Sequence, residues 1–236
     1  MPSVRKVTVN KAAGRAGKLA ARAPSPRLGR EQRIDEILVA ARDVFCRKGY
    51  EQTAVSEIAA SIGVVEGTVF KYFATKRDLL LAVLERWYDA ISDDRARELA
   101  GITTHRERLR IVIHGHLRTI RDQPLLCRLM FREVRAEQDY RGSGLHDKNR
   151  LYTRFLMDVI NDGIAAGEFR RDVSPSLMRD LVYGAVEHLT WNYVCGRGEL
   201  DVDAIAAELT AMVCDGIETT ARVAAANKTP RLANRR

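Results

Sequence analysis

Apolar residues recur at intervals of three and four along this 236-residue chain, and this spacing constrains the fold more than any other feature. It is the period of amphipathic helices, each of which turns one apolar stripe toward a core. No segment keeps the alternation of two that a half-buried strand needs, and glycine or proline separates the periodic segments. The sequence therefore predicts an all-α fold. The expected helices cover about 31–48, 55–62, 66–73, 75–87, 105–122, 125–137, 145–166, 175–195 and 203–223.

Basic residues concentrate at the two ends of the chain. Residues 1–30 contain eight lysines and arginines and no acidic residue, so they account for the whole formal net charge of +8. We expect a disordered basic arm at 1–30 and a disordered basic tail at 224–236, because neither segment has enough apolar surface to order itself. Such arms are attracted to phosphate. A merely solubilising tail is the alternative.

Several classes of protein are disfavoured by what the sequence lacks. No apolar run approaches the length of a membrane span, and no secretory signal pattern is present. The cysteines are scattered without a C-x-x-C pair, which is typical of a reducing cytoplasm. The five histidines are dispersed, and no nucleophile–base order or glycine-rich phosphate loop stands out. We expect a cytoplasmic protein that is not an enzyme and has neither a cofactor nor a metal site.

Residues 55–74 meet the steric demands of a helix-turn-helix. The small residue Ala59 stands where two helices cross, and Gly63 stands at the turn, where a positive φ is needed. Apolar residues at 58, 62, 64 and 69 fix the angle between the helices. The outward side can then enter a major groove, and an ordinary helical corner is the alternative. This side carries Glu66, Gly67, Thr68, Lys71 and Tyr72.

The stretch GYEQTAVSEIAASIGVVEGTVFKYFATKRDLL, residues 49–80, resembles the DNA-binding module of the TetR family of bacterial regulators. The resemblance implies a DNA-binding domain at 31–78 and a helical ligand-binding and dimerisation domain at 79–223. It places Thr68, Lys71, Tyr72 and Lys76 at positions that usually touch DNA. It places Thr53 and Ser56 at the start of the supporting helix, which meets the phosphate backbone or a base edge.

Three positions depart from the family pattern. Val65 stands where a serine usually caps the recognition helix, and Ala54 stands where a capping hydroxyl is common. Each lost cap costs about 1 kcal/mol. Phe70 replaces a tyrosine whose hydroxyl usually reaches phosphate, so this module has fewer phosphate contacts than is usual.

The last two expected helices are rich in small residues, which let helices approach closely. The resemblance implies that these helices form the interface of a homodimer. A purely intramolecular core is the alternative. The expected interface residues are Gly184, His188, Trp191, Ala207 and Ala211.

The resemblance also implies an apolar pocket for a small molecule within the later helices. The segments LMFREVRAE, DVINDGIAAGEFRRDVSP and LVYGAVEHLTWNYV are similar to the FadR-type, fatty-acid-degradation branch of the family, which responds to long-chain acyl-coenzyme A. An arginine stripe (Arg128, Arg132 and Arg135) beside Leu129 and Met130 suits an acyl chain with a phosphate-bearing head. The candidate pocket residues are Trp87, Met130, Phe131, Arg135, Tyr152, Phe155 and Tyr183.

We therefore expect a transcriptional regulator that binds a palindromic double-stranded operator as a homodimer. A repressor relieved by its ligand is the favoured mode, although the sequence leaves activation open. The alternatives are the same role with an aromatic or drug-like effector, and a helical interaction protein that needs no ligand.

Overall fold

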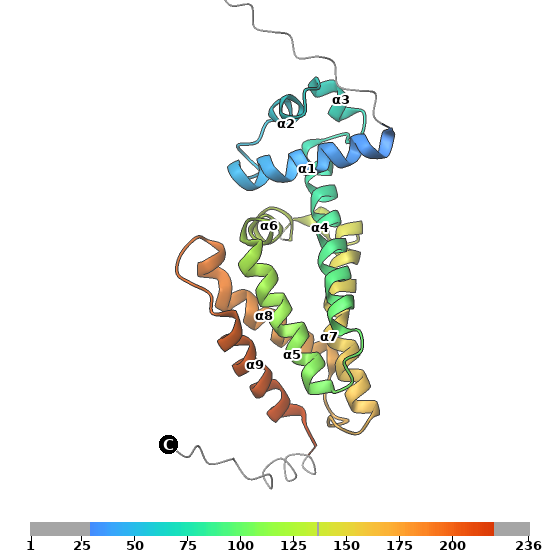
Figure 1. Cartoon of the computed structure of the whole chain (residues 1–236), viewed down its shortest axis with the longest axis vertical. Coiled ribbons are helices and arrows are strands. Elements are labelled where there is room, and N and C mark those ends of the chain that lie inside the picture. Colours follow the sequence, from blue (N-terminus) through green and yellow to red (C-terminus); the bar gives the residue numbers. More distant parts are fainter. Residues whose placement is uncertain (1–28, 136, 220–236) are drawn as a thin grey trace, which may run out of the picture.

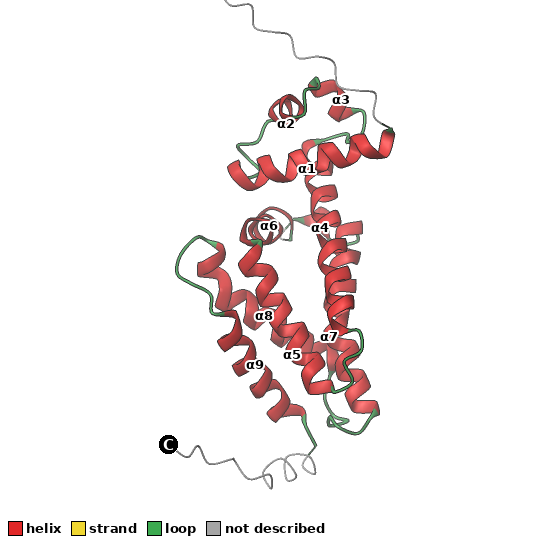
Figure 2. Cartoon of the chain, viewed as in Figure 1, coloured by secondary structure: helices red, strands yellow, loops and turns green. Residues whose placement is uncertain are grey.

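The structure is a computed structural model that describes residues 29–135 and 137–219. Within these ranges the chain forms helices and loops, and its sole β-type pairing is an isolated bridge between Phe169 and Glu218 (Figure 2). The predicted all-α fold is confirmed. The basic arm and tail predicted at 1–30 and 224–236 lie outside the described residues, apart from residues 29 and 30.

Three helices form a compact module at one end of the molecule (Figure 1). They are α1 (Arg30–Lys48), α2 (Val55–Ser61) and α3 (Glu66–Phe70). Ile37, Ala41 and Phe45 of α1 are fully buried, and α1 packs against α2 and against the long helix that follows the module. Gly49 and Gly63 adopt φ values of 79° and 71°, so the chain turns at the two positions where the sequence predicts a left-handed residue.

The long helix α4 (Lys76–Leu99) joins this module to the rest of the molecule, and it packs against both α1 and α7. Its first turn has the capping box expected from the sequence. The Thr75 hydroxyl accepts from the Asp78 amide at 3.0 Å, and the Asp78 carboxylate accepts from the Thr75 amide at 3.0 Å. The domain boundary predicted between residues 78 and 79 therefore lies inside a continuous helix.

The larger part is a bundle in which α5 contacts α7, α8 and α9, and α6 lies between the bundle and the module (Figure 1). Its α-helices are α5 (His105–Asp122), α6 (Pro124–Leu129), α7 (Gly144–Ala165), α8 (Pro175–Val194) and α9 (Val202–Ile217). A π-helical turn, η1 (Met130–Val134), and a 3-10 turn, η2 (Gln138–Tyr140), follow α6.

Four predicted helices differ from the structure. The helix predicted at 75–87 continues to Leu99. The helix predicted at 125–137 is divided, because α6 passes into η1, where the Arg135 amide donates to the Met130 carbonyl five residues earlier at 3.0 Å. The recognition helix ends at Phe70 rather than at residue 73. The last helix ends at Ile217, and residues 220–223 of the predicted range lie outside the described residues.

The described residues contain no helix that is both long enough and apolar enough to cross a bilayer. They also contain no group of three or more metal-ligating side chains. All four cysteines are free thiols.

Candidate DNA interface and regulatory cavity

The α2–α3 pair presents one exposed surface at the outer end of the module. Ile58, Ala59 and Val69 are buried where the two helices cross. Their packing leaves the opposite side of α3 in solvent, and an added side-chain carbon at Gly67 would meet no atom within 4 Å. We call this side the reading surface. It consists of Ser56, Glu66, Gly67, Thr68, Lys71 and Tyr72, of which Thr68 and Tyr72 are partly buried.

Two of the predicted DNA contacts, Thr53 and Lys76, belong to the scaffold that supports the reading surface. Thr53 is buried, and its hydroxyl donates to the Gly49 carbonyl at 2.7 Å, so its hydrogen is not available to a phosphate oxygen. The Lys76 ammonium donates to the carbonyls of Tyr50 (2.9 Å), Glu51 (3.4 Å) and Thr53 (3.1 Å), which uses all three of its hydrogens. It also lies 4.3 Å from the centre of the Tyr50 ring. In the free protein these two side chains therefore hold the backbone of the module, and their contact with DNA remains a prediction.

The first turns of α2 and α3 lack side-chain caps, as the sequence predicts. Neither Ala54 at the start of α2 nor Val65 at the start of α3 makes a side-chain capping hydrogen bond. Val65 is 74% exposed, and Phe70 is 43% exposed at the other end of α3. The recognition helix is thus five residues long, uncapped, and held mainly by Val69.

Arg77 fastens the first turn of α4 to the segment that follows α6. Its guanidinium donates to both carboxylate oxygens of Asp139, at 3.0 and 2.7 Å, and to the Glu133 carbonyl at 2.5 Å. A bidentate arginine–carboxylate pair fixes the relative orientation of the two groups. Sequence spacing gives no sign of this contact, because the partners are 56 and 62 residues apart. We call these contacts the Arg77 clasp.

The bundle encloses a cavity of about 510 Å³ between α4, α5, α7, α8 and η1. Its outer side carries Arg135, Arg150 and Arg179, and its inner side carries the buried residues Tyr88 and Met130. Five of the seven residues predicted for a ligand pocket line it, namely Met130, Phe131, Arg135, Tyr152 and Tyr183.

Trp87 and Phe155, the other two predicted pocket residues, do not line this cavity. Trp87 lies next to Tyr88 on α4, but it turns into the core, where it is only 8% exposed. Phe155 packs against the same core without reaching the cavity. Both residues were predicted from apolar character alone, which does not distinguish a cavity wall from solid core.

The three arginines of the predicted stripe do not all face the cavity. Arg135 lines the cavity and pairs with Glu187, whereas Arg128 and Arg132 are exposed and do not line it. The π-helical turn is the physical reason, because one extra residue rotates the following side chains by about 100° around the helix. Arg150 and Arg179, from α7 and α8, complete the basic outer side instead.

The inner side of the cavity is more polar than an apolar pocket prediction allows. Tyr88, His116 and Asn149 line it and were not predicted from the sequence. The Tyr88 hydroxyl donates to the Asn149 side-chain oxygen at 3.1 Å, and the Asn149 side-chain nitrogen donates to the Tyr140 hydroxyl at 2.7 Å. Burial raises the pKa of the Tyr88 hydroxyl well above its usual value, so it stays protonated.

His116 is held in its neutral form. Burial, with smaller contributions from the positive charges of Arg95 and Arg135, lowers its pKa to about 3. Its Nδ1 lies 3.1 Å from the Tyr152 hydroxyl, a contact that either group can donate.

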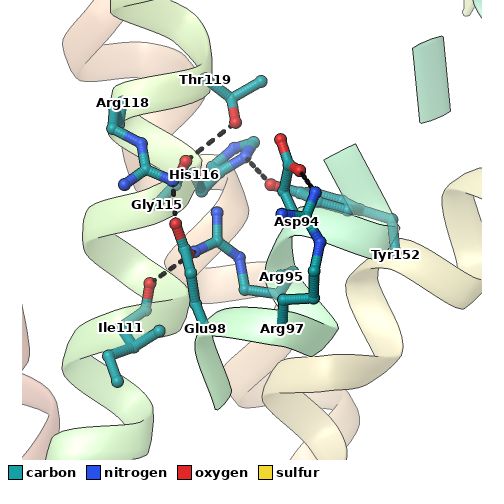
Figure 3. Close-up of polar contacts among 10 residues, drawn as sticks. All are labelled: Asp94, Arg95, Arg97, Glu98, Ile111, Gly115, His116, Arg118, Thr119 and Tyr152. Atoms are coloured by element: carbon teal, nitrogen blue, oxygen red, sulfur yellow. Dashed lines mark hydrogen bonds and ion pairs between the residues drawn. The ribbon is translucent and has the colours of Figure 1, made fainter. Parts of the chain in front are cut away.

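A charged network lies beside this histidine (Figure 3). The Arg95 side chain reaches from α4 to α5, where it is only 2% exposed and donates to the Ile111 carbonyl at 2.9 Å. Arg95 also pairs with Glu98, and Glu98 pairs with Arg118 of α5. The inner side of the cavity is therefore tied to α4, the helix that carries the module.

The outward surface of α8 and α9 is apolar and open to solvent in the single chain. Of the residues predicted for a dimer contact, Gly184, His188, Trp191 and Ala207 are exposed and Ala211 is partly buried. Patches of large apolar side chains on a surface mark sites of association. We call this surface the α8/α9 face, and its large exposed side chains are Leu177, Leu181, Leu189, Trp191 and Met212.

A helix-turn-helix module joined by one continuous helix to a bundle with a cavity defines a DNA-binding protein with a separate ligand-binding part. Residues 37–83 match the model of the bacterial regulatory proteins of the tetR family, and residues 103–217 match the tetracycline-repressor-like C-terminal domain. Together the two matches span more than half of the chain. The chain belongs to the TetR family and is a DNA-binding transcriptional regulator.

Two characterised proteins show the range of its relatives. The fatty acid metabolism regulator protein of Bacillus subtilis is 24% identical over 182 residues, which are 77% of this chain and 94% of that protein. The transcriptional repressor KstR2 of Mycobacterium tuberculosis is 28% identical over 197 residues, which are 78% of this chain and 92% of that protein.

Solved structures share the fold. The crystal structure of FadR from Bacillus subtilis in complex with stearoyl-CoA superposes with a TM-score of 0.69 at 24% identity, covering 78% of this chain and 99% of that one. FadR from Bacillus halodurans gives a TM-score of 0.68 at 22% identity, covering 80% and 96% of the two chains.

Proposed function

We propose that this protein is a ligand-relieved repressor that binds a palindromic operator as a homodimer and leaves it when an acyl-coenzyme A thioester enters the cavity. The main support for the proposal is that α4 extends from the module to the cavity. This helix starts directly behind the reading surface and contributes Tyr88 to the cavity wall, so one rigid element touches both sites. A ligand that moves the wall moves the reading surface with it.

The cavity supports a thioester effector. Met130 and Phe131 provide apolar contact, and Arg135, Arg150 and Arg179 provide cations at the outer side for phosphate groups. The names of the relatives support the same class, because one regulates fatty acid metabolism and a structural neighbour was solved with stearoyl-CoA. The role proposed is binding, and no catalytic step is assigned to any residue.

The α8/α9 face supports a homodimer. A dimer would cover the exposed leucines of α8 and Met212 of α9, and it would hold two reading surfaces at a fixed separation. Two such surfaces read half-sites about one helical turn apart, which makes the operator pseudo-palindromic. We also place the protein in the cytoplasm, where operator DNA lies and where its four thiols stay reduced.

The DNA-binding half of the proposal is tested with genomic fragments selected on the purified protein. Lys71→Ala and Tyr72→Ala should each weaken binding to the selected operator by at least tenfold, since each removes a direct contact from the reading surface. Lys148→Ala on α7, which removes a lysine paired with Asp89 and not part of the reading surface, is the matched control and should bind as the parent does. If both reading-surface variants bind the operator as tightly as the parent does, α3 is not the helix that recognises DNA.

The ligand half is tested by adding palmitoyl-CoA or free coenzyme A to the operator complex. Micromolar palmitoyl-CoA should release the protein, and free coenzyme A should not, because it lacks the apolar body. If an aromatic or drug-like compound releases the protein and no acyl-CoA does, the effector belongs to the alternative class.

The dimer is tested by Ala207→Glu on α9, with Ala165→Glu at the end of α7 as the control. A carboxylate buried at the interface should give monomers in sedimentation experiments and weaken operator binding. An intact dimer from Ala207→Glu would exclude the α8/α9 face.

A further inference from the structure

We propose that the effector carries a neutral oxygen, a hydroxyl or a carbonyl, on its apolar body, and that Tyr183 and His116 bind this oxygen at the inner side of the cavity. The inference rests on the proposed function and narrows it from acyl thioesters in general to oxygenated ones. No part of it depends on which ring or chain forms the apolar body.

Aromatic side chains from three helices meet at this inner side. The His116 ring of α5 lies edge-on to the Tyr183 ring of α8, with 4.7 Å between their centres. The Tyr152 ring of α7 lies 5.8 Å from His116 and 6.1 Å from Tyr183. We call these three residues the aromatic wall. All three line the cavity.

The polar groups near the wall divide into those with a protein partner and those without one. The Tyr88 hydroxyl is bonded to Asn149, and the Tyr152 hydroxyl is bonded to Nδ1 of His116. The Tyr183 hydroxyl and Nε2 of His116 make no hydrogen bond to any residue in the part of the chain that the structure describes. Both residues are partly accessible, and the cavity is the space that they line. Water can bond these two atoms when the cavity is open, and a ligand that fills the inner side displaces that water. An oxygen on the ligand then replaces the hydrogen bonds that the water made.

The chemistry of the two groups selects a neutral oxygen. A tyrosine hydroxyl donates one hydrogen bond and accepts others, and Nε2 of a neutral histidine donates or accepts according to its tautomer. A hydroxyl on the effector satisfies either tautomer, and a carbonyl satisfies the one with hydrogen on Nε2. The neutral state of His116, caused by burial beside Arg95 and Arg135, removes the positive charge that would favour a carboxylate at this place.

The rest of the cavity gives the effector its orientation. In the lining, Arg135 and Arg150 are exposed and Arg179 is partly exposed, whereas Met130 is buried and Phe131 is partly buried. An anionic carrier group therefore stays at the outer side, and the bound oxygen lies on the part of the effector that is remote from it. A purely hydrocarbon body, such as that of palmitoyl-CoA, can still bind, but it leaves two polar groups without partners and should bind about tenfold more weakly than an oxygenated one.

The test compares matched thioesters that differ by one oxygen. One pair is hexadecanoyl-CoA and 16-hydroxyhexadecanoyl-CoA. A second pair is a fused-ring carboxylic acid thioester with and without a ring ketone. Binding is measured by calorimetry, and operator release is measured by fluorescence anisotropy, with the full-length protein. We expect the oxygenated member of at least one pair to bind about tenfold or more tightly than its partner.

Tyr183→Phe isolates the hydroxyl, and Tyr193→Phe on the same helix is the matched control. The Tyr193 hydroxyl donates to the Arg121 carbonyl at 2.9 Å and does not line the cavity. Tyr183→Phe should abolish the preference for the oxygenated thioester and leave the affinity for the unsubstituted one within twofold. Tyr193→Phe should change neither affinity.

Three outcomes would overturn the inference. Equal binding of both members in both pairs, with operator release intact, would refute it while the proposed function stands. An equal loss of affinity for both members in Tyr183→Phe would show that the ring only packs. Failure of all four thioesters to bind would refute the proposed function together with this inference.

Discussion

The guanidinium of Arg95 occupies the space beside Gly115 that a side chain at that position would fill. An ideal Cβ built on Gly115 would lie 1.5 Å from Nη1 of Arg95 and 1.9 Å from its Cζ (Figure 3). Arg95 is on α4 and Gly115 is on α5, so the absence of a side chain at 115 lets a buried cation cross between the helices. Its Nη1 pairs with Glu98 and donates to the Ile111 carbonyl, whereas its buried Nε has no hydrogen-bond partner among the described residues. This contact sets the distance of α4 from the bundle.

Gly115→Ala should displace the Arg95 guanidinium and lower the free energy of unfolding by about 3 kcal/mol, because a buried charge loses its partners. Urea denaturation followed by circular dichroism measures the change. Gly67→Ala is the matched control, since an added Cβ there meets no atom within 4 Å. The double variant Arg95→Met with Gly115→Ala should lose less than the sum of the single variants, because both act on one contact. Wild-type stability of Gly115→Ala would contradict the packing described.

The Arg77 clasp should matter more for the response to ligand than for folding. It is partly exposed and joins the start of α4 to the segment after η1, which supplies Arg135 to the cavity. Arg77→Ala should therefore raise the palmitoyl-CoA concentration for half-release of the operator by about tenfold, equivalent to about 1.4 kcal/mol of coupling. Operator affinity without ligand should stay within threefold of the parent.

Asp139→Asn is the companion variant of the clasp. If the ion pair carries the coupling, the double variant with Arg77→Ala should respond to ligand no more weakly than Arg77→Ala alone. Additive effects in anisotropy titrations would show that the two residues act separately.

Val65→Ser should stabilise the recognition helix by about 1 kcal/mol, because it supplies the capping oxygen that α3 lacks. Val65 is 74% exposed, so little apolar burial is lost. Thermal denaturation should show a higher midpoint for Val65→Ser and no gain for Val65→Ala, which removes the same side chain without adding a cap. A gain of equal size from both variants would assign the effect to the loss of an exposed valine.

His116 should make the protein less stable as the pH falls below about 6.5. The folded-state pKa is about 3, so between these values the unfolded chain takes up a proton that the folded chain does not. The slope contributed by this group approaches 1.4 kcal/mol per pH unit. The charged groups that face it are Arg95 on α4 and Arg135 after η1, and neither changes charge in this range.

Urea denaturation at pH 7, 6 and 5 measures this dependence. His116→Asn should lose stability less steeply than the parent over the same range, because the group that titrates is gone. Parallel pH profiles for the two proteins would show that His116 gains a proton as easily in the folded state as in the unfolded one.

The sequence by itself determined the features that depend on neighbouring residues. The helical period, the turns at Gly49 and Gly63 and the capping box of Thr75 and Asp78 are local, and the structure has each where the pattern predicts it. The exposed side of α3 also followed from the sequence, because burying Val69 leaves only one side of a short helix free. Contact of this side with DNA remains a prediction.

The tertiary structure decided what depends on residues distant in the chain. In the structure Trp87 lies in the core, whereas its neighbour Tyr88 lines the cavity. The π-helical turn η1 separates Arg135, which lines the cavity, from Arg128, which does not. The tertiary structure also placed the Lys76 ammonium against the carbonyls of Tyr50 and Thr53, a contact that the sequence did not predict. The physical reason is that residue type and spacing indicate which side of a helix is buried, whereas only the packing of helices from different parts of the chain decides whether that side meets solid core, a cavity or a charge.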